Sequence, residues 1–235
     1  ISYDKETKTV TISHEVLNTL GSGEVDFKVL TQRNSVSLKL TIADSFIYTA
    51  DDFYDIFEPN FDAGNPSFKE GSLKGYYVLG ADIDLTEYLG VGEKGYNGGK
   101  GWFPIGAYDD GVLDLPFDGP FNGNGHKITG FSYNKAASVN GMFGRIGING
   151  VVKNFSIEGK ISEDGVKSWG GIVSGNNAGT IENIISNVSL PNGGHSATGV
   201  FASVNHGLIQ NCVSISNEVL GYKETAQPWQ RAGIA

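Results

Sequence analysis

The chain has 235 residues, including 34 glycines, and its 17 basic and 26 acidic side chains give a formal net charge of −9. This length suffices for one large domain or two smaller ones with a buried core. The acidic balance argues against nucleic acid as a partner, because phosphates require a basic surface. No apolar run of about 18 residues occurs, so no membrane span is predicted, and a single cysteine excludes an intrachain disulfide framework.

Residues 1–44 are predicted to form a small β unit with one short helix. Apolar and polar residues alternate in Thr9–Ile12, Glu24–Leu30 and Val36–Ile42, which is typical of strands with one buried face. The segment Ser13–Leu20 predicts one or two helical turns. Three strands are too few for a sandwich, which needs about seven. We therefore expect the missing strands upstream of residue 1, or support from the rest of the chain.

Residues 45–72 are predicted to be a linker that contains a short amphipathic helix. Thr49 suits the N-cap position, Asp51 and Asp52 suit the N-terminal turn, and Pro59 ends the pattern. One face carries an apolar stripe of Phe53, Ile56 and Phe57. The helix is expected to join the next domain or to plug it.

Residues 73–235 contain an internal repeat. One signature starts with glycine and two apolar residues, at Gly141, Gly171 and Gly199, which lie 30 and 28 residues apart. A second signature places asparagine between apolar residues, at Asn154, Asn183 and Asn211, spaced by 29 and 28 residues. Gly130 is predicted to take the asparagine position in a further, degenerate copy.

A period of about 28–30 residues built from short strands predicts an all-β fold, a right-handed parallel β-helix in which each unit is one turn. In-register stacking should place Asn154, Asn183 and Asn211 in one column at a corner, because asparagine tolerates a left-handed backbone and its amide can bond along the stack. Phe155, Ile184 and Cys212 should then stack in the interior. We expect the coil to be truncated at the C-terminus, and its open edge to favour end-to-end self-association of the fragment.

The variable excess of each unit is expected to form loops on one side of the coil, at Glu158–Ser168, Asn187–Thr198 and Asn217–Arg231. Connections of a dozen residues often carry function.

Two family resemblances accompany this repeat. The order Tyr76–Leu85, Trp102–Gly106, Phe117–Gly130 and the tetrad Gly141-Met-Phe-Gly144 resembles GLUG-motif bacterial surface proteins, although the units at Gly171 and Gly199 depart at the fourth position of the tetrad. That resemblance implies a β-helical, exported or cell-surface, adhesin-like protein, and it transfers no catalytic residues. Residues 3–42 resemble the C-terminal half of bacterial Ig-like modules.

Aromatic side chains are the main candidates for ligand binding. An exposed aromatic face stacks on sugars or on a partner protein. Alternatively, the Trp102 segment closes the N-terminal end of the coil, as any solenoid requires. The candidates gather in the glycine-rich stretch 86–111 or sit at a loop: Tyr88, Tyr96, Trp102, Tyr108 and Trp169.

Carboxylates are the candidates for metal binding or acid–base catalysis. Asp109, Asp110 and Asp114, with Asp118 close by, crowd one segment, and a Ca²⁺ site there is the possible cofactor. Asp82 and Asp84 share one face of a predicted strand. The favoured interpretation is a solvated acidic loop without metal, cofactor or catalytic residue.

The sequence as a whole favours a non-catalytic, secreted or cell-surface bacterial protein that is adhesin-like or a scaffold. Its loops would bind glycan or a host or cell-surface protein. Two alternatives stay open. One is a polysaccharide-active lyase or hydrolase on the same β-helix, and the other is a purely structural stalk.

Overall fold

A computed structural model describes residues 1–30, 33–60, 66–109, 113–134, 139–162, 169–189, 198–215 and 231–232 of the chain. The side chains of residues 108, 109, 113, 139, 169, 198, 231 and 232 are not described. The chain divides into two units, Ile1–Asp44 and Ser45–Ala235. Each unit is considered by itself.

The first unit consists of two antiparallel strand pairs and a short helix. The pairs are β1 (Ser2–Asp4) with β2 (Thr9–Thr11), and β3 (Gly23–Leu30) with β4 (Ser35–Ile42); α1 is His14–Asn18. The predicted hairpin is confirmed, but alternate residues of β3 are only partly covered and no residue of β3 or β4 is fully buried, so the predicted buried face is absent from these two strands. On β4, Val36 and Leu38 remain 56% and 48% exposed. The resemblance to an Ig-like module stays a prediction.

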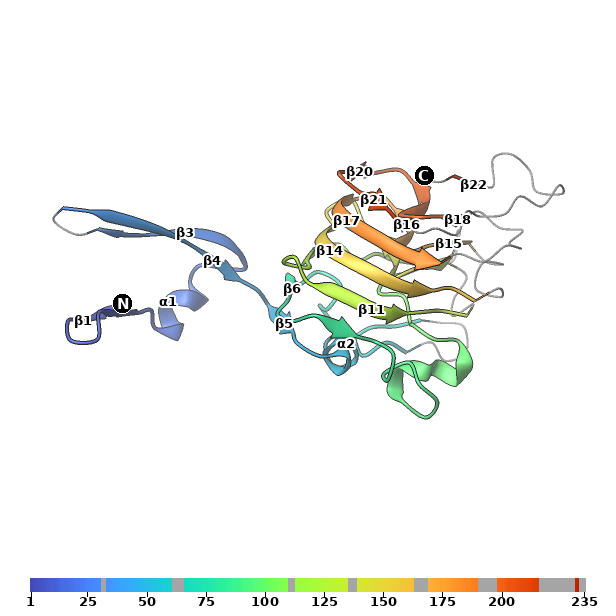
Figure 1. Ribbon diagram of the computed structural model, residues 1–235, viewed down its shortest axis with the longest axis horizontal. Coiled ribbons are helices and arrows are strands. Elements are labelled where there is room, and N and C mark those ends of the chain that lie inside the picture. Colours follow the sequence, from blue (N-terminus) through green and yellow to red (C-terminus); the bar gives the residue numbers. More distant parts are fainter. Residues whose placement is uncertain are drawn as a thin grey trace. The chain divides into compact units, whose positions relative to one another are not determined.

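The second unit is a right-handed parallel β-helix of about five turns, as predicted. In Figure 1, β11, β14 and β17 cross the near face in one direction while the chain rises from bottom to top. The ladders between turns are all parallel in the described residues, and three stacks result. The first stack bends at a corner and comprises β5 (Ser45–Ile47), β6 (Tyr77–Leu79), β7 (Ile83–Asp84), β10 (Pro120–Asn122), β11 (Lys127–Phe131), β14 (Val151–Lys160), β17 (Thr180–Ser189), β20 (Leu208–Gln210) and β21 (Val213–Ser214).

The other two stacks complete each turn. One comprises β12 (Val139–Asn140), β15 (Trp169–Gly171), β18 (Thr198–Gly199) and β22 (Arg231–Ala232), and the other β13 (Phe143–Ile146), β16 (Ser174–Asn177) and β19 (Ala202–Asn205). An antiparallel pair, β8 (Ala107–Asp109) with β9 (Leu113–Leu115), lies outside the stacks. Strands β14, β17 and β21 therefore end at one corner of the coil, called here the loop corner, and the chain returns to the coil at β15, β18 and β22.

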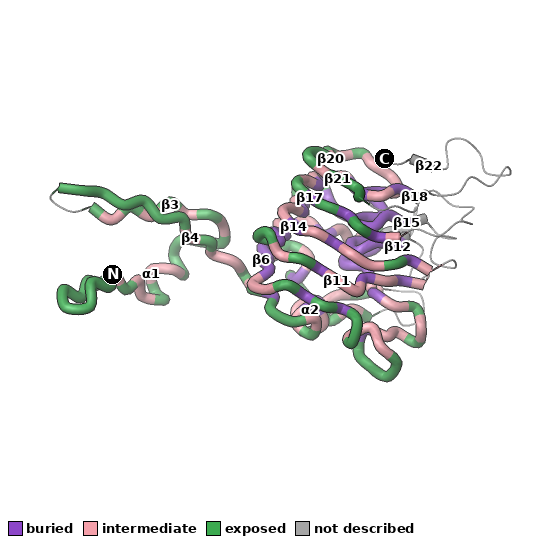
Figure 2. Tube along the Cα trace, in the orientation of Figure 1, coloured by how far each residue is buried: buried purple, intermediate pink, exposed green. Residues whose placement is uncertain are grey.

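The interior of the coil is filled by apolar side chains from successive turns. Phe155 pairs in register with Ile184, and Val152 pairs with Ile181. These four side chains are at most 3% exposed, and Figure 2 shows the buried residues along the inside of the stack. Full burial of each such side chain contributes about 1.5–3 kcal/mol relative to exposure.

The three predicted asparagines form a column at the corner within the first stack. Asn154, Asn183 and Asn211 have φ angles of 63°, 54° and 54°. The Asn183 Nδ2 donates to the Asn154 Oδ1 at 3.0 Å, and the Asn154 Nδ2 donates to the Asn122 Oδ1 at 3.1 Å. The Asn154 and Asn183 side chains therefore bond along the stack, and a left-handed backbone turns the corner at all three asparagines.

The prediction that Gly130 replaces an asparagine in this column is wrong. Strand β10 pairs with the first half of β14, and the Gly125 N–H donates to the Asn154 carbonyl at 2.8 Å. The corner of this turn is thus at Asn124, with φ of 53°. Gly130 lies inside β11, where the register against β14 shifts.

A second corner uses asparagine and glycine together. The Asn177 Nδ2 donates to the Asn205 Oδ1 at 2.7 Å. The Asn177 Oδ1 accepts the Gly179 N–H, and the Asn205 Oδ1 accepts the Gly207 N–H. A Cβ atom on Gly207 would overlap the Gly179 carbonyl oxygen, and one on Gly179 would overlap the Gly150 carbonyl oxygen. Close approach of successive turns requires glycine here.

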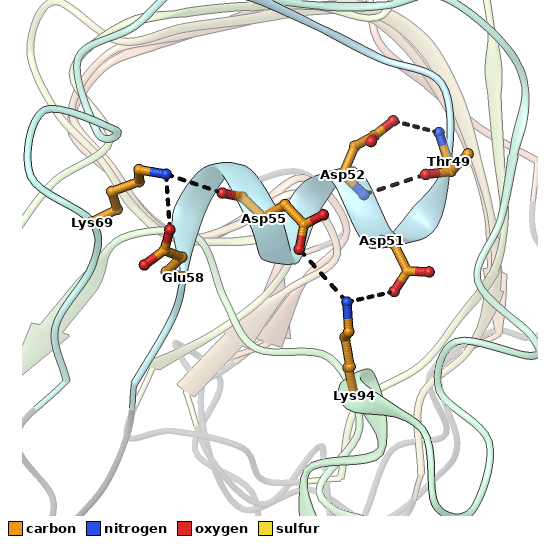
Figure 3. Close-up of polar contacts among 7 residues, drawn as sticks. All are labelled: Thr49, Asp51, Asp52, Asp55, Glu58, Lys69 and Lys94. Carbon is orange, nitrogen blue, oxygen red and sulfur yellow. Dashed lines mark hydrogen bonds and ion pairs between the residues drawn. The ribbon is translucent and has the colours of Figure 1, made fainter.

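Helix α2 (Ala50–Phe57) closes the N-terminal end of the coil, within the segment predicted as a linker. Thr49 and Asp52 form a capping box, with the Asp52 N–H donating to the Thr49 Oγ1 at 3.4 Å and the Thr49 N–H to the Asp52 Oδ2 at 2.8 Å (Figure 3). Phe53 and Phe57 are 3% and 1% exposed. The ring centroid of Phe57 lies 5.0 Å from that of Tyr77 on β6. The predicted plug is therefore part of the core.

Candidate functional site: a cleft at the loop corner

A cleft of about 320 Å³ opens at the corner where the connections leave the coil. Its walls come from three segments: the 3-10 helix η2 (Lys94–Gly99) with the residues after it, the chain after β11, and the end of β14 with the chain after it. The lining residues are Leu89, Tyr96, Gly99, Gly101, Ser132, Tyr133, Asn134, Lys160, Ile161 and Ser162.

Backbone hydrogen bonds join the walls of the cleft. The Trp102 N–H donates to the Ser132 carbonyl at 3.0 Å, and the Asn134 N–H donates to the Lys100 carbonyl at 2.6 Å. Gly101, with φ of 75°, permits this approach, because a Cβ atom there would lie 2.8 Å from the Ser132 carbonyl oxygen. The residues after β11 run beside the residues after β14. Phe131, the last residue of β11, pairs with Gly159, and the Ser162 N–H donates to the Tyr133 carbonyl at 3.4 Å.

The polar groups of the cleft centre on Asn134. Its Nδ2 donates to the Gly99 carbonyl at 3.4 Å, and its Oδ1 accepts from the Ser162 Oγ at 2.8 Å. These two bonds fix which way the amide faces. An amide nitrogen carries two hydrogens, so Asn134 retains one N–H for a ligand in addition to the bond to Gly99.

The floor of the cleft is apolar. Tyr133 and Ile161 are 1% and 0% exposed, and Leu89 packs against the core. The Tyr133 hydroxyl donates to the Gly171 carbonyl at 3.4 Å, and burial raises the pKa of this phenol. Tyr133 therefore supplies a neutral, fixed surface and no acid–base group.

The η2 wall is braced against the cap helix. The Lys94 Nζ lies 3.4 Å from the Asp51 Oδ1 and 3.6 Å from the Asp55 Oδ1 (Figure 3), and 5.3 Å from the centre of the Tyr54 ring. Desolvation lowers the pKa of Lys94, but the two carboxylates outweigh it and raise this pKa above its ordinary value. A second ion pair on α2, from the Lys69 Nζ to the Glu58 Oε1 at 2.8 Å, holds the segment after the helix.

The predicted aromatic platform is only partly present. Tyr96 lines the cleft. Trp102 is 3% exposed, packs on Phe53 with ring centroids 5.1 Å apart, and donates from Nε1 to the Met142 carbonyl at 3.0 Å. The prediction of Trp102 as a binding residue is therefore wrong, and the alternative of a capping residue fits its surroundings.

The other aromatic candidates contribute less. Tyr88 is partly buried beside Trp102, with ring centroids 6.4 Å apart, and burial, together with nearby acidic groups, raises its pKa. The side chains of Tyr108 and Trp169 lie outside the described part of the structure. Of the five predicted binding residues, Tyr96 is the one that the structure places at a cavity of useful size.

The predicted calcium ligands are occupied by other partners or lie outside the described residues. The Arg145 Nε lies 2.7 Å from the Asp114 Oδ1, so a guanidinium takes the place that a cation would need. Asp110 and the side chain of Asp109 are outside the described residues. Within the ranges that the structure describes, no three His, Cys, Asp or Glu side chains converge on a metal position.

The remaining acidic candidates bind neighbouring backbone. The Asp82 Oδ1 accepts from the Lys127 N–H and contacts the His126 Nδ1, both at 3.0 Å. The Lys127 bond, with His126 second, lowers the pKa of Asp82. The Asp84 Oδ1 accepts the Thr86 N–H at 2.9 Å, and the hydrogen bonds from Thr86 lower the pKa of Asp84. The Asp82 carboxylate therefore joins neighbouring turns, and the Asp84 carboxylate holds the backbone of its own turn.

Asp118 and the single cysteine, Cys212, both form hydrogen bonds with neighbouring groups. Asp118 accepts from Asn149 through both carboxylate oxygens, at 2.9 and 2.8 Å. Cys212 is half-buried, and desolvation raises the pKa of its thiol. A raised pKa lowers the fraction of thiolate, which is the reactive form of a cysteine.

Sequence reasoning missed the polar residues of the cleft, namely Ser132, Asn134, Lys160 and Ser162. No motif marks them. The signal that could have found them is the period of the coil. Residues 132–134 come directly after β11, residues 160–162 lie at the end of β14 and directly after it, and the two segments are 28 residues apart. The bond between Ser162 and Asn134 shows that they are neighbours.

Comparisons with known proteins give two informative relatives. The chain is 41% identical over 111 residues to a protein of Evansella cellulosilytica that is named as a Gly-rich membrane protein, and 35% identical over 129 residues to halomucin of Haloquadratum walsbyi. These matches cover 46% and 54% of this chain, but 12% and 1% of the relatives. No family model and no solved structure matches the chain. The described helices are all too short or too polar to cross a bilayer.

Proposed function

We propose that this chain is a display segment of a cell-surface protein, in which a rigid β-helix presents one corner for adhesion to a glycan or to another surface protein. The observation that carries the proposal is the common exit corner. Strands β14, β17 and β21 pair in register and each hands the chain to the stack of β15, β18 and β22. The connections therefore start from fixed points on successive turns.

The core makes the display rigid. Each turn is held to the next by parallel ladders, by two asparagine columns and by buried apolar stacks. The names of the two relatives, a Gly-rich membrane protein and halomucin, support a place at the cell surface. The resemblances to GLUG-motif proteins and Ig-like modules agree with the same role.

The adhesive role can be tested with beads coated with the purified chain. We expect such beads to bind glycan-coated or protein-coated surfaces, and a variant in which residues 163–168 and 190–197 are replaced by short Gly-Ser connections to lose this binding. A matched control, Lys153→Gln with Glu182→Gln, changes outward side chains of β14 and β17 away from that corner. Equal binding by both variants would exclude the corner as the adhesive surface.

The same preparation separates the two alternatives. If the beads bound neither glycan-coated nor protein-coated surfaces, this result would favour a structural stalk. Incubation with polyuronates that yields unsaturated or reducing-end products would establish an enzyme. We expect no products, because the described carboxylates that could serve as an acid–base pair, Asp82, Asp84, Asp114 and Asp118, are each engaged by neighbouring groups.

A further inference from the structure

The cleft at the loop corner has an unusual balance of charge. The whole chain carries a net charge of −9, but Lys160 is the one ionic side chain among the described residues that line the cleft. Lys160 is exposed at the end of β14. Within the described part of the chain its ammonium has no carboxylate within 4.0 Å, in contrast with Lys127 on β11, which pairs with Glu158 at 3.3 Å.

The other lining groups match the surface of a sugar ring. Sugar rings offer hydroxyls around the edge and C–H groups on the faces. The cleft offers hydroxyls from Ser132 and Ser162 and the oriented amide of Asn134. Tyr96 adds an aromatic ring, and its hydroxyl lies near Gly99 in the same wall.

The size of the cleft limits the ligand. At about 320 Å³ it lies at the lower end of the range for small-molecule sites. One sugar residue, or the end of a longer glycan, suits that space. Phosphate groups are usually held by arginine forks or helix N-termini, and the described lining of the cleft contains neither. A single lysine acts as a point charge and suits a single carboxylate.

We infer that this cleft binds one acidic sugar residue, with the sugar carboxylate at the Lys160 ammonium, ring hydroxyls at Asn134 and Ser132, and an apolar sugar face on Tyr96. This inference rests on the proposed adhesive function and names the ligand class for it. The brace from Lys94 to Asp51 and Asp55 holds the Tyr96 wall in place before the ligand arrives.

The test compares two ligands that differ only at C6, where methyl β-glucuronoside carries a carboxylate and methyl β-glucoside a neutral hydroxymethyl group. Binding to the intact chain is measured by NMR titration at about 20 mM salt, where screening is weak. We expect the glucuronoside to bind about fivefold more tightly, the upper range for an exposed ion pair, and this preference to shrink as salt is raised.

Four variants identify the site. Lys160→Gln should remove the preference and leave glucoside binding unchanged. Lys153→Gln, seven residues earlier in β14 and on the other side of the Asn154 corner, should retain the preference. Tyr96→Phe should bind as the wild type does, whereas Tyr96→Ala should lose both ligands, with folding of each variant checked by circular dichroism.

Several outcomes would overturn the inference: binding of neither glycoside, equal binding of both, or a preference that survives Lys160→Gln. The bead assay distinguishes a failure of the acidic-sugar site from a failure of the proposed adhesive function. Beads that adhere although the glucuronoside does not bind would reject the acidic-sugar site alone. A glucuronoside bound through Lys160 by a chain whose beads do not adhere would reject the adhesive function alone.

Discussion

The asparagine column makes a quantitative prediction at Asn183. This residue combines a left-handed backbone, with φ of 54°, and an amide hydrogen bond of 3.0 Å to Asn154. Replacement by alanine removes both features. An L-residue without a short polar side chain pays about 1–2 kcal/mol in the left-handed region, and an exposed hydrogen bond contributes about 0.5–1 kcal/mol. We expect Asn183→Ala to lower the free energy of unfolding by about 1.5–3 kcal/mol.

Glycine at the same position separates the two contributions. Asn183→Gly removes the hydrogen bond but accepts the backbone angle, so it should cost about 1 kcal/mol less than Asn183→Ala. Urea unfolding followed by circular dichroism measures the difference. Asn187→Ala is the matched control, because Asn187 lies exposed in regular β17, and we expect a change within about 0.5 kcal/mol. If alanine proved as stable as glycine at position 183, the conformational explanation of the column would be refuted.

Three further predictions follow from contacts described above. Gly179→Ala should destabilise the coil by about 1–3 kcal/mol in urea unfolding, because the new Cβ overlaps a carbonyl oxygen of the turn below; a neutral result would mean that successive turns are not in close contact there. Trp102→Ala should cost about 3–5 kcal/mol by the same measurement, and a cost below about 1 kcal/mol would argue for an exposed indole. For Asp82, the bond from the Lys127 N–H lowers the folded-state pKa, so its stabilising effect is complete above the ordinary aspartate pKa of about 3.9 and is lost as the pH falls through the lower folded-state value. The difference in melting temperature between wild type and Asp82→Asn should therefore be present at neutral pH and shrink below about pH 4, and a difference independent of pH would contradict this assignment.

The repeat could be predicted from the sequence because its physical requirement recurs in every turn. A corner needs a residue that tolerates a left-handed backbone, and parallel stacking places the same need one turn later. The spacing of Asn154 and Asn183 in the sequence therefore predicts both the β-helical architecture and the register between successive turns. Gly130-Phe-Ser132 resembles Asn154-Phe-Ser156 and so misplaces the corner, whereas Asn124, which turns it with φ of 53°, lies 30 residues before Asn154 and fits the period.

The cleft as a whole could not be predicted, because the period that relates Asn134 to Ser162 does not place the segment of Tyr96 beside them. Tyr96, Asn134 and Ser162 belong to three stretches of chain that meet only after the coil has closed. Trp102 shows the complementary difficulty. It lies in a glycine-rich stretch with other aromatic residues, which is typical of a binding residue. Its burial, however, depends on Phe53 of helix α2, which is distant in the sequence.

The capped, in-register coil has a consequence for how such a protein can vary in length. Each turn contacts the turns directly above and below it, so duplication of a unit of about 28 residues between β14 and β17 would leave α2 and its brace unchanged. Every extra unit would lift the later connections by one strand spacing, about 4.8 Å. The distance between neighbouring display positions is therefore a multiple of this strand spacing. The number of turns can change during evolution while the interior packing of each turn stays the same.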